Sequence, residues 1–408
     1  MSPQSSVTVV GVGDDGWPGL TQGARTALGE APVIVGSARH LALLPDLPEL
    51  PGRRIPLPSP LLPALDELVA ANPGACLLAS GDPMLHGLGA TLARRLGAGR
   101  VRVLPAVSSV ALACAALGWA EHDVDVVSVV SAPAEVILPA VQPGSRVLVL
   151  SRDGGTPAAV GALLSDRGWG STQLTVLEHL GGSAERVRGP YPARSVDAGD
   201  RPFSDLSVLA LACEPDAGTV ILPRLPGLPD AAYQSDGQLT RREARVLALA
   251  ALAPGPGQLL WDVGAGSGSV GIEWMRTDAR SRAIAVECRP ERAERVGCNA
   301  TALGVPGIEV ICGPAPAALA GLARPDAVFV GGGLTGDGVL DRCWDALSPG
   351  GRLVAHAVTV ESEALLHEWQ RAVGGQLVKL ALSYAGPLGT FTTWRPALPL
   401  TQWQVIRP

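Results

Sequence analysis

The chain has 408 residues, of which 47% are hydrophobic and 17% are charged. This length predicts two or three domains, and the aliphatic-rich composition excludes a disordered protein. The net charge of −6 comes without any block of basic residues, so we expect no nucleic-acid partner. Seven scattered cysteines without a CxxC pair indicate a reducing cytoplasm and argue against a zinc site or a disulfide framework.

The first half of the chain predicts strands that alternate irregularly with helices, and therefore two small α/β lobes. Its aliphatic and β-branched runs end at turn residues, which is typical of buried strands. The expected strands lie near residues 7–10, 33–35, 75–79, 101–103, 126–130, 146–151, 173–178 and 206–212. An uncharged span at 103–120 contains Pro105 and Gly118, which favours a buried helix over a membrane span.

A segment rich in proline and glycine, 214–237, separates the two halves and predicts a linker. The predicted domains are therefore 1–213 and 238–408. Directly after the linker, Thr240 and Glu243 have the spacing of a capping box, so a helix is expected from there to about Leu252.

The second half alternates regularly between strands and helices. Strands are expected at 258–263, 282–287, 307–312, 326–330 and 351–359, and a final strand pair near 376–384 and 390–396. Helices are expected at 268–276, 290–303, 315–322, 336–347 and 361–373. This alternation predicts a doubly wound, mostly parallel sheet of the Rossmann type.

The first strand of this half enters a glycine turn made of Gly264, Ala265, Gly266, Ser267 and Gly268. A dinucleotide fingerprint needs a third glycine where Ser269 stands, so the turn favours a nucleoside sulfonium, S-adenosylmethionine. Glu287 ends the next strand, 19 residues past Gly268, where a carboxylate can accept both ribose hydroxyls. The alternative is a purely structural turn with Glu287 as a surface charge.

Three motifs of the first half lie at predicted strand ends. They are Gly11-Val12-Gly13, Ser80-Gly81-Asp82-Pro83 and Pro105-Ala106-Val107-Ser108-Ser109. Taken singly, the Gly-Asp-Pro turn is common and the serine pair could simply cap a helix. In this order and spacing the motifs resemble the tetrapyrrole (corrin/porphyrin) methylase family, and 177–182 is similar to its subfamily acting on precorrin-6. The stretches 239–243, 261–269, 313–316 and 354–361 resemble the partner methyltransferase of the same pathway step.

The resemblance implies an α/β protein with a bilobed tetrapyrrole-methylase fold followed by a Rossmann-like S-adenosylmethionine methyltransferase fold. The first domain would methylate C5 of precorrin-6B in cobalamin biosynthesis. The second would methylate C15 and decarboxylate the C12 acetate. Each domain would bind one S-adenosylmethionine, and a homo-oligomer would form through the C-terminal domain. The alternative is that only the C-terminal domain is active and the first is a substrate-binding scaffold.

The resemblance also implies particular cofactor contacts. In the first domain these fall on Gly81, Asp82, Leu85, Ser108 and Ser109, and in the second Thr240 and Ala315 join the glycine turn and Glu287. The chain departs from the family patterns twice. Residues 130–132 read Val-Ser-Ala where relatives have His-Gly-Arg, and His356 stands where relatives have Asn.

Methyl transfer from a sulfonium needs alignment and exclusion of water, and decarboxylation needs a controlled proton supply. His356 is the main catalytic candidate, for proton handling or for binding a substrate carboxylate; alternatively it is a hydrogen-bonded histidine of the cleft wall. Glu243 is a weaker candidate that could serve only as a helix cap. Arg241, Arg242 and Arg289 could meet substrate carboxylates. The six histidines never pair at ligand spacing, so no metal is expected. An NAD-dependent dehydrogenase and a non-catalytic carrier remain competing hypotheses.

Overall fold

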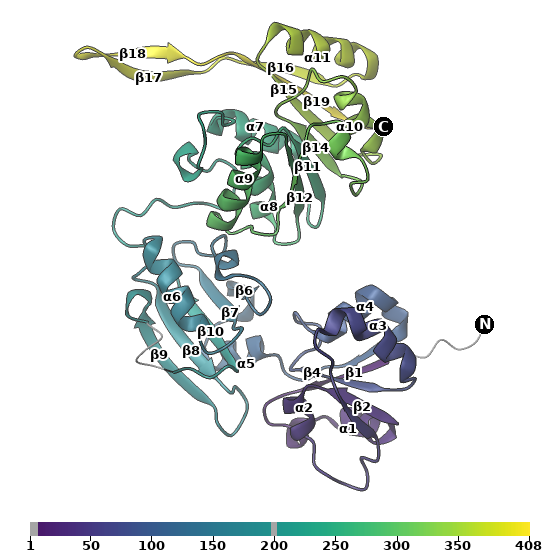
Figure 1. Ribbon diagram of the computed structural model, residues 1–408. Helices are drawn as coiled ribbons and strands as arrows, with labels where there is room; N and C mark the ends of the chain where they lie inside the picture. Colours follow the sequence, from purple (N-terminus) through teal and green to yellow (C-terminus); the bar gives the residue numbers. More distant parts are fainter. Residues whose placement is uncertain (1–6, 197–201) are drawn as a thin grey trace. The chain divides into compact units, whose positions relative to one another are not determined.

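The computed structural model describes residues 7–196 and 202–408, which form two compact units. Unit 1 comprises Met1–Ala134 and Pro143–Thr219, and unit 2 comprises Glu135–Gln142 and Val220–Pro408. The elements of both units are labelled in Figure 1. Each unit is built from α/β layers with its own buried clusters of aliphatic side chains.

Unit 1 begins with a five-stranded, fully parallel sheet in the order β3-β2-β4-β1-β5. Its strands are β1 (Val7–Val12), β2 (Val33–Gly36), β3 (Arg53–Pro56), β4 (Cys76–Ser80) and β5 (Val101–Leu104). Its helices are α1 (Gln22–Glu30), α2 (Ala38–Ala42), α3 (Leu61–Ala71) and α4 (Leu88–Leu96). The central strands β1 and β4 are almost wholly buried, as continuous apolar runs require in a parallel sheet.

The second sheet of unit 1 is mixed, in the order β6-β7-β10-β8-β9. Its strands are β6 (Val124–Ser128), β7 (Arg146–Leu150), β8 (Gln173–Glu178), β9 (Arg186–Pro192) and β10 (Ser207–Ala212), and its helices are α5 (Ser109–Leu117) and α6 (Thr156–Asp166). The uncharged span at 103–120 contains the helix α5, which is partly buried through Val110, Ala113 and Cys114. Strands β3 and β9 were not expected from the sequence, and both lie at the edge of a sheet.

Unit 2 has a seven-stranded sheet in the order β13-β12-β11-β14-β15-β19-β16. Its strands are β11 (Leu259–Val263), β12 (Arg282–Glu287), β13 (Glu309–Cys312), β14 (Ala327–Val330), β15 (Arg352–Ala357), β16 (Gln376–Leu380) and β19 (Leu400–Ile406). Its helices are α7 (Arg242–Leu252), α8 (Ser269–Thr277), α9 (Pro290–Ala302), α10 (Val339–Ala346) and α11 (Val360–Val373). The first five strands are parallel, and the chain reverses direction across the sheet between β11 and β14.

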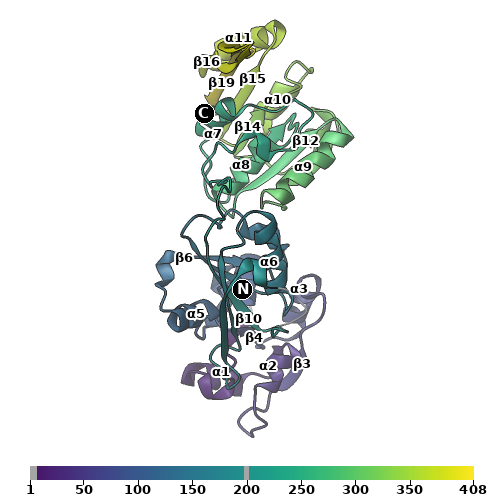
Figure 2. The same cartoon turned by 90° about the vertical axis from the view of Figure 1, so that its left-hand side faces the viewer.

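The helices of unit 2 cover both faces of this sheet (Figure 2). Apolar side chains of α7, α8 and α9 form one buried cluster with the sheet, around Trp274 and Phe329. Side chains of α10 and α11 form the other, around Trp261 and Trp403. This is the doubly wound architecture that the alternating sequence pattern predicts.

The end of the chain differs from the prediction of one final strand pair. Strand β19 was missed, and it lies antiparallel between β15 and β16. The strands β17 (Ser383–Leu388) and β18 (Phe391–Pro396) instead form a separate two-stranded ribbon, which projects from the body of the unit in Figure 1. The predicted helix at 315–322 is only a short 3-10 turn at Ala317–Leu319.

Much of the segment expected as a linker packs against unit 2. Leu228 and Tyr233 are buried in its core, and the Tyr233 hydroxyl donates to Glu273 over 2.8 Å. The predicted capping box is wrong, because α7 begins after Arg241 and no side chain caps it. Its start instead holds the Thr240 carbonyl, which accepts from the buried Arg245 guanidinium.

Candidate functional site

The glycine turn after β11 brings two backbone segments into contact. Gly264, Gly266 and Gly268 all have positive φ angles, of 69°, 60° and 76°. A Cβ on Gly264 would lie 2.5 Å from the carbonyl oxygen of Gly332, which follows β14. Only glycine combines this backbone conformation with so close an approach. Because β11 lies between β12 and β14, where the chain reverses direction across the sheet, this turn lies at the switch point. Open α/β sheets bind ligands at such points.

Glu287, at the end of β12, holds the middle of this turn. Its side chain is buried, with the residue 4% exposed, so the alternative of a surface charge is wrong. One carboxylate oxygen accepts from the Gly266 N–H over 2.8 Å, and the other accepts from the Arg289 N–H over 3.0 Å. The carboxylate is thereby fixed at the rim of the glycine turn, where it also borders a cavity.

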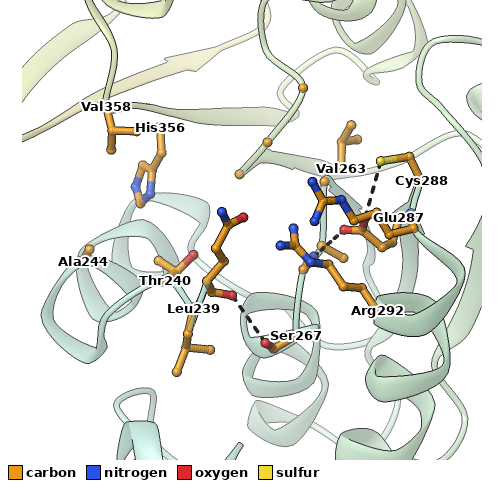
Figure 3. A pocket seen from close by; sticks show the side chains of 18 of the residues that line it. Leu239, Thr240, Ala244, Val263, Ser267, Glu287, Cys288, Arg292, His356 and Val358 are labelled. Carbon is orange, nitrogen blue, oxygen red and sulfur yellow. Dashed lines mark hydrogen bonds between the residues drawn. The ribbon is translucent and has the colours of Figure 1, made fainter. Parts of the chain in front are cut away.

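This cavity has a volume of about 860 Å³ and lies entirely within unit 2. The predicted site residues that line it are Thr240, Gly264, Ala265, Gly266, Ser267, Glu287, Ala315 and His356. Figure 3 shows Thr240, Ser267, Glu287 and His356 around the same space. Its volume suits a drug-sized ligand or larger. Of the residues predicted for this unit, Gly268 and Glu243 do not line it.

Gly268 and Glu243 have other environments. Gly268 precedes the first turn of α8, and a Cβ there would lie 2.7 Å from a methyl group of Val296. Glu243 is exposed, and its carboxylate accepts from the Tyr384 hydroxyl over 2.8 Å. Its own backbone N–H and the Tyr384 hydroxyl lower the pKa of this carboxyl group. Glu243 is therefore an ionised surface group outside the cavity.

His356 projects from the carboxyl end of β15 toward the cavity and is 7% exposed (Figure 3). Its Nε2 lies 3.0 Å from the side-chain oxygen of Gln402 on β19. The Phe329 ring packs edge-on against the imidazole, with ring centroids 4.9 Å apart. Burial lowers the pKa of His356 to about 4, although the Gln402 hydrogen bond acts in the opposite direction. The imidazole is therefore neutral at pH 7.

Three arginine side chains contribute to the lining of the cavity. Arg241, Arg289 and Arg292 line it, whereas Arg242 does not. Arg292 pairs with Asp236 over 2.7 Å, and Arg241 with Asp230 over 3.3 Å. Guanidinium groups suit the carboxylates of an anionic substrate.

The three motifs of unit 1 lie at the ends of three neighbouring strands, β4, β1 and β5. The Gly81 N–H donates to the Val12 carbonyl over 2.9 Å, and the Gly81 carbonyl accepts from the Ala106 N–H over 3.3 Å. A Cβ on Gly81 would lie 3.2 Å from the Val107 carbonyl, directly before the serine pair. The order of motifs along the sequence thus corresponds to a single edge of the first sheet.

Their side chains have mainly local partners. Asp82 accepts from the Met84 N–H over 2.8 Å and so closes the Gly-Asp-Pro turn. Ser108 caps α5 by accepting from the Ala111 N–H over 3.0 Å, while Ser109 is the first residue of that helix. Leu85 packs against the apolar cluster that α5 shares with the second sheet of unit 1. Both the cap and the turn are compatible with a ligand above the backbone.

Sequence reasoning missed a polar network beside this edge. Asp14 accepts from His179 Nδ1 over 3.0 Å and from Arg39 over 3.0 Å. The Nε2 atom on the other side of the His179 ring lies 2.9 Å from the Ser204 hydroxyl. Arg39 also donates to Ser80, next to the Gly-Asp-Pro turn. Asp14 directly follows the Gly11-Val12-Gly13 motif, and this position is the only feature of the sequence that could have indicated it.

Two features are absent from the part of the chain that the structure describes. Across the described ranges 7–196 and 202–408, no three His, Cys, Asp or Glu side chains come together as metal ligands would. A search of the same residues finds no helix with both the length and the hydropathy to cross a membrane.

Comparisons with known proteins agree with this arrangement. Residues 6–192 match the family model of tetrapyrrole (corrin/porphyrin) methylases, and residues 231–407 match that of the precorrin methyltransferase domain. The chain thus joins two methyltransferase domains. A Sinorhizobium precorrin-6Y C(5,15)-methyltransferase [decarboxylating] is 48% identical over 97% of this chain and 95% of its own length. A protein of the same name from Mycobacterium tuberculosis is 45% identical over 98% and 100%.

The chain belongs to the family of precorrin-6Y C(5,15)-methyltransferases (decarboxylating). Among solved structures, the C-terminal domain of the Rhodobacter capsulatus precorrin-6Y C5,15-methyltransferase is 45% identical. It aligns with 46% of this chain and 100% of its own length, at a TM-score of 0.44. The predicted fold class and the predicted methyltransferase activity are confirmed, with S-adenosylmethionine as the methyl donor. This membership argues against the dehydrogenase and carrier hypotheses.

Proposed function

We propose that the two units divide the reaction on precorrin-6B between them. Unit 2 methylates C15 and decarboxylates the C12 acetate, and unit 1 methylates C5. The observation that carries the proposal is the cavity of unit 2, in which the glycine turn, Glu287 and His356 meet at the switch point of the sheet. The resemblance of each half to a different methylase supports the division.

In unit 2 the cofactor would lie over the glycine turn. Glu287 offers a fixed carboxylate for the ribose hydroxyls, and Thr240 and Ala315 border the rest of the cofactor. The cofactor supplies the methyl group and the sulfonium leaving group. The protein aligns it with the macrocycle and excludes water. Arg241, Arg289 and Arg292 supply charges for the substrate carboxylates.

We propose that unit 1 binds a second S-adenosylmethionine at the edge formed by Gly81, Asp82, Leu85, Ser108 and Ser109. These residues occupy adjoining strand ends and turn ends of one unit. The boundaries 1–213, 214–237 and 238–408 remain our functional division, although residues 220–237 pack with unit 2.

Mass spectrometry of the full chain with precorrin-6B and isotopically labelled S-adenosylmethionine tests the proposal. The expected product carries two added methyl groups and lacks one carboxyl group. Gly266→Arg should fill the cavity, because Gly266 lines it and a Cβ there would have its nearest neighbour 3.7 Å away. This variant should keep only C5 methylation, and Gly81→Arg should keep only the C15 and C12 steps.

Two outcomes would contradict the proposed division of the reaction between the two units. If Gly266→Arg abolishes both methylations in a folded protein, the division between the units is wrong. If Gly81→Arg leaves both methylations intact, unit 1 is a substrate-binding scaffold rather than a second methyltransferase. Circular dichroism of each variant provides the check on folding.

We also propose a homo-oligomer that forms through the C-terminal domain. The ribbon of β17 and β18 exposes large apolar side chains: Leu388, Phe391, Trp394 and, just beyond it, Leu398, which are 61–78% exposed. An isolated two-stranded ribbon is marginally stable in water, and exposed apolar patches mark interaction sites. A second copy of the chain would cover this ribbon.

Light scattering coupled to gel filtration tests the oligomer. The double variant Phe391→Asp with Trp394→Asp should reduce the mass to that of one chain. Val360→Asp is the matched control, because Val360 is 81% exposed at the start of α11. A wild-type mass of one chain would contradict the proposal. All seven cysteines are free thiols, and we place the enzyme in the cytoplasm on the basis of their usage.

A further inference from the structure

A row of amide side chains crosses the sheet of unit 2 beside His356. Gln402 donates from its Nε2 to the Oε1 of Gln404 over 2.9 Å, and Gln404 donates in the same way to Gln376 over 2.9 Å. His356 pairs with Gln402 across β15 and β19, and Gln404 pairs with Gln376 across β19 and β16. Side chains two residues apart on a strand share a face, so the register itself builds this row.

The row has a fixed direction. An amide nitrogen only donates hydrogen bonds, and an amide oxygen only accepts them. Because Gln402 uses its nitrogen toward Gln404, its oxygen faces His356. The Nε2 atom of His356 must therefore carry a proton and donate it over 3.0 Å. In a neutral imidazole the lone pair is then on Nδ1.

Nδ1 is the functional end of this ring. It has no hydrogen-bond partner in the described part of the protein, and it is not fully buried. His356 lines the cavity. The other charged side chains of the cavity wall are Arg241, Glu287, Arg289 and Arg292. Since burial keeps the imidazole neutral, its lone pair repels a carboxylate. Of the two roles expected for His356, carboxylate binding is thereby disfavoured.

We propose that in this chain, which has His356 where relatives have Asn, His356 Nδ1 is the proton acceptor in C15 methylation and Gln402 is a positioning residue that fixes its tautomer. The proposal rests on the proposed function of unit 2. As the macrocycle attacks, a C–CH₃ bond forms at C15 and the S–CH₃ bond breaks, with its electron pair remaining on sulfur. The C15 proton then passes to Nδ1, and its electron pair restores the conjugation of the ring. The imidazolium afterwards releases the proton to water.

The tautomer can be observed without turnover. Long-range ¹⁵N–¹H NMR of the full chain, with ¹⁵N-labelled histidine, resolves the two ring nitrogens, and His356→Gln identifies the signal. We expect the Nε2–H tautomer at neutral pH. An Nδ1–H tautomer or an imidazolium would overturn the proposal. This result does not depend on whether unit 2 carries out the C15 reaction, so the two proposals fail separately.

Kinetics test the role of the lone pair. His356→Gln should reduce kcat for C15 methylation by roughly 10²-fold or more, the usual range for a general base, with little change in KM. Gln402→Leu should give a smaller loss of kcat. In Gln402→Glu the new carboxylate should stabilise the imidazolium and move the acidic limb of the kcat profile to higher pH.

The matched control is Gln370→Leu on α11, outside the cavity wall, which should leave the profile unchanged. A purely structural role for Gln402 predicts lower stability with an unshifted pH profile in Gln402→Glu, and that result would refute positioning. An unchanged C15 rate in folded His356→Gln, with C15 methylation retained, would refute the proton-acceptor role while leaving the function of unit 2 intact.

Discussion

Replacing Gly264 with alanine should destabilise unit 2 more than the same change at Gly266, two residues later. Both glycines have left-handed backbones, with φ angles of 69° and 60°. Their surroundings differ. A Cβ on Gly264 would lie within 2.6 Å of three backbone atoms of Gly332, whereas a Cβ on Gly266 would have its nearest neighbour, the Gln238 carbonyl, at 3.7 Å. No rotamer change can relieve a clash with backbone.

The magnitudes follow from these two contributions. A left-handed conformation costs a residue with a Cβ roughly 1–2 kcal/mol, which both variants share. Overpacking costs a further ~1–3 kcal/mol, and only Gly264→Ala incurs it. The variants should therefore differ in unfolding free energy by ~1–3 kcal/mol. For a domain of 150–250 residues this corresponds to a difference of about 2–12 °C in Tm.

Differential scanning calorimetry of the full chain measures this difference. Gly321→Ala is a matched control, since Gly321 has a φ of 77° with open space around its Cβ. It should equal Gly266→Ala in stability but should not affect cofactor affinity, which titration calorimetry measures. Equal destabilisation by Gly266→Ala and Gly264→Ala would show that the contact with Gly332 does not cause the difference.

Three further predictions concern buried groups of unit 2. Glu273→Ala should lower the unfolding free energy by roughly 3–5 kcal/mol in denaturant titrations, because it leaves the fully buried Arg245 with Asp230 as its remaining carboxylate and removes the acceptor of the Tyr233 hydroxyl. Arg280→Ala, in an exposed pair with Asp278, should change it by under about 0.5 kcal/mol. Burial raises the pKa of Asp262 to about 7, so the folded state binds more protons than the unfolded state and stability should fall as pH rises from about 4 to 7. Asp262→Asn, which retains an acceptor for the Gly271 N–H, should flatten this slope in chemical unfolding, and an unchanged slope would contradict the assignment. A thiol reagent should modify the native chain quickly at the three exposed cysteines only; fast labelling of Cys343, whose pKa burial raises to about 12, would contradict its packing. The exposed cysteines are Cys288, Cys298 and Cys312.

The sequence was most informative where strands are central and buried. Continuous apolar runs such as 259–263 are found within a residue or two of their predicted positions. The missed strands β3 and β9 are edge strands, with polar residues and proline in place of a clear pattern. Edge strands carry such residues because they discourage pairing with other chains. Their absence from the prediction therefore has a physical cause.

The missed strand β19 explains why Gln402 could not be predicted. Thr401, Trp403 and Val405 face one way and the glutamines the other, but the run is short and polar on one side. Its place between β15 and β16 depends on long-range pairing, which no local pattern encodes. The glycine turn and Glu287 were predictable because strand ends of a parallel sheet converge on one edge. The contact between His356 and Gln402 could be predicted only from the register between β15 and β19.

Unit 2 is discontinuous in sequence, since it takes residues 135–142 from within the first half of the chain. A Cβ on Gly304 would lie 2.5 Å from the Pro139 side chain and 2.8 Å from the Glu135 carbonyl. This segment therefore packs closely against the backbone at Gly304. During synthesis it leaves the ribosome long before the helices and strands that receive it. Residues 135–142 can therefore pack into unit 2 only after the C-terminal half of the chain has been synthesised.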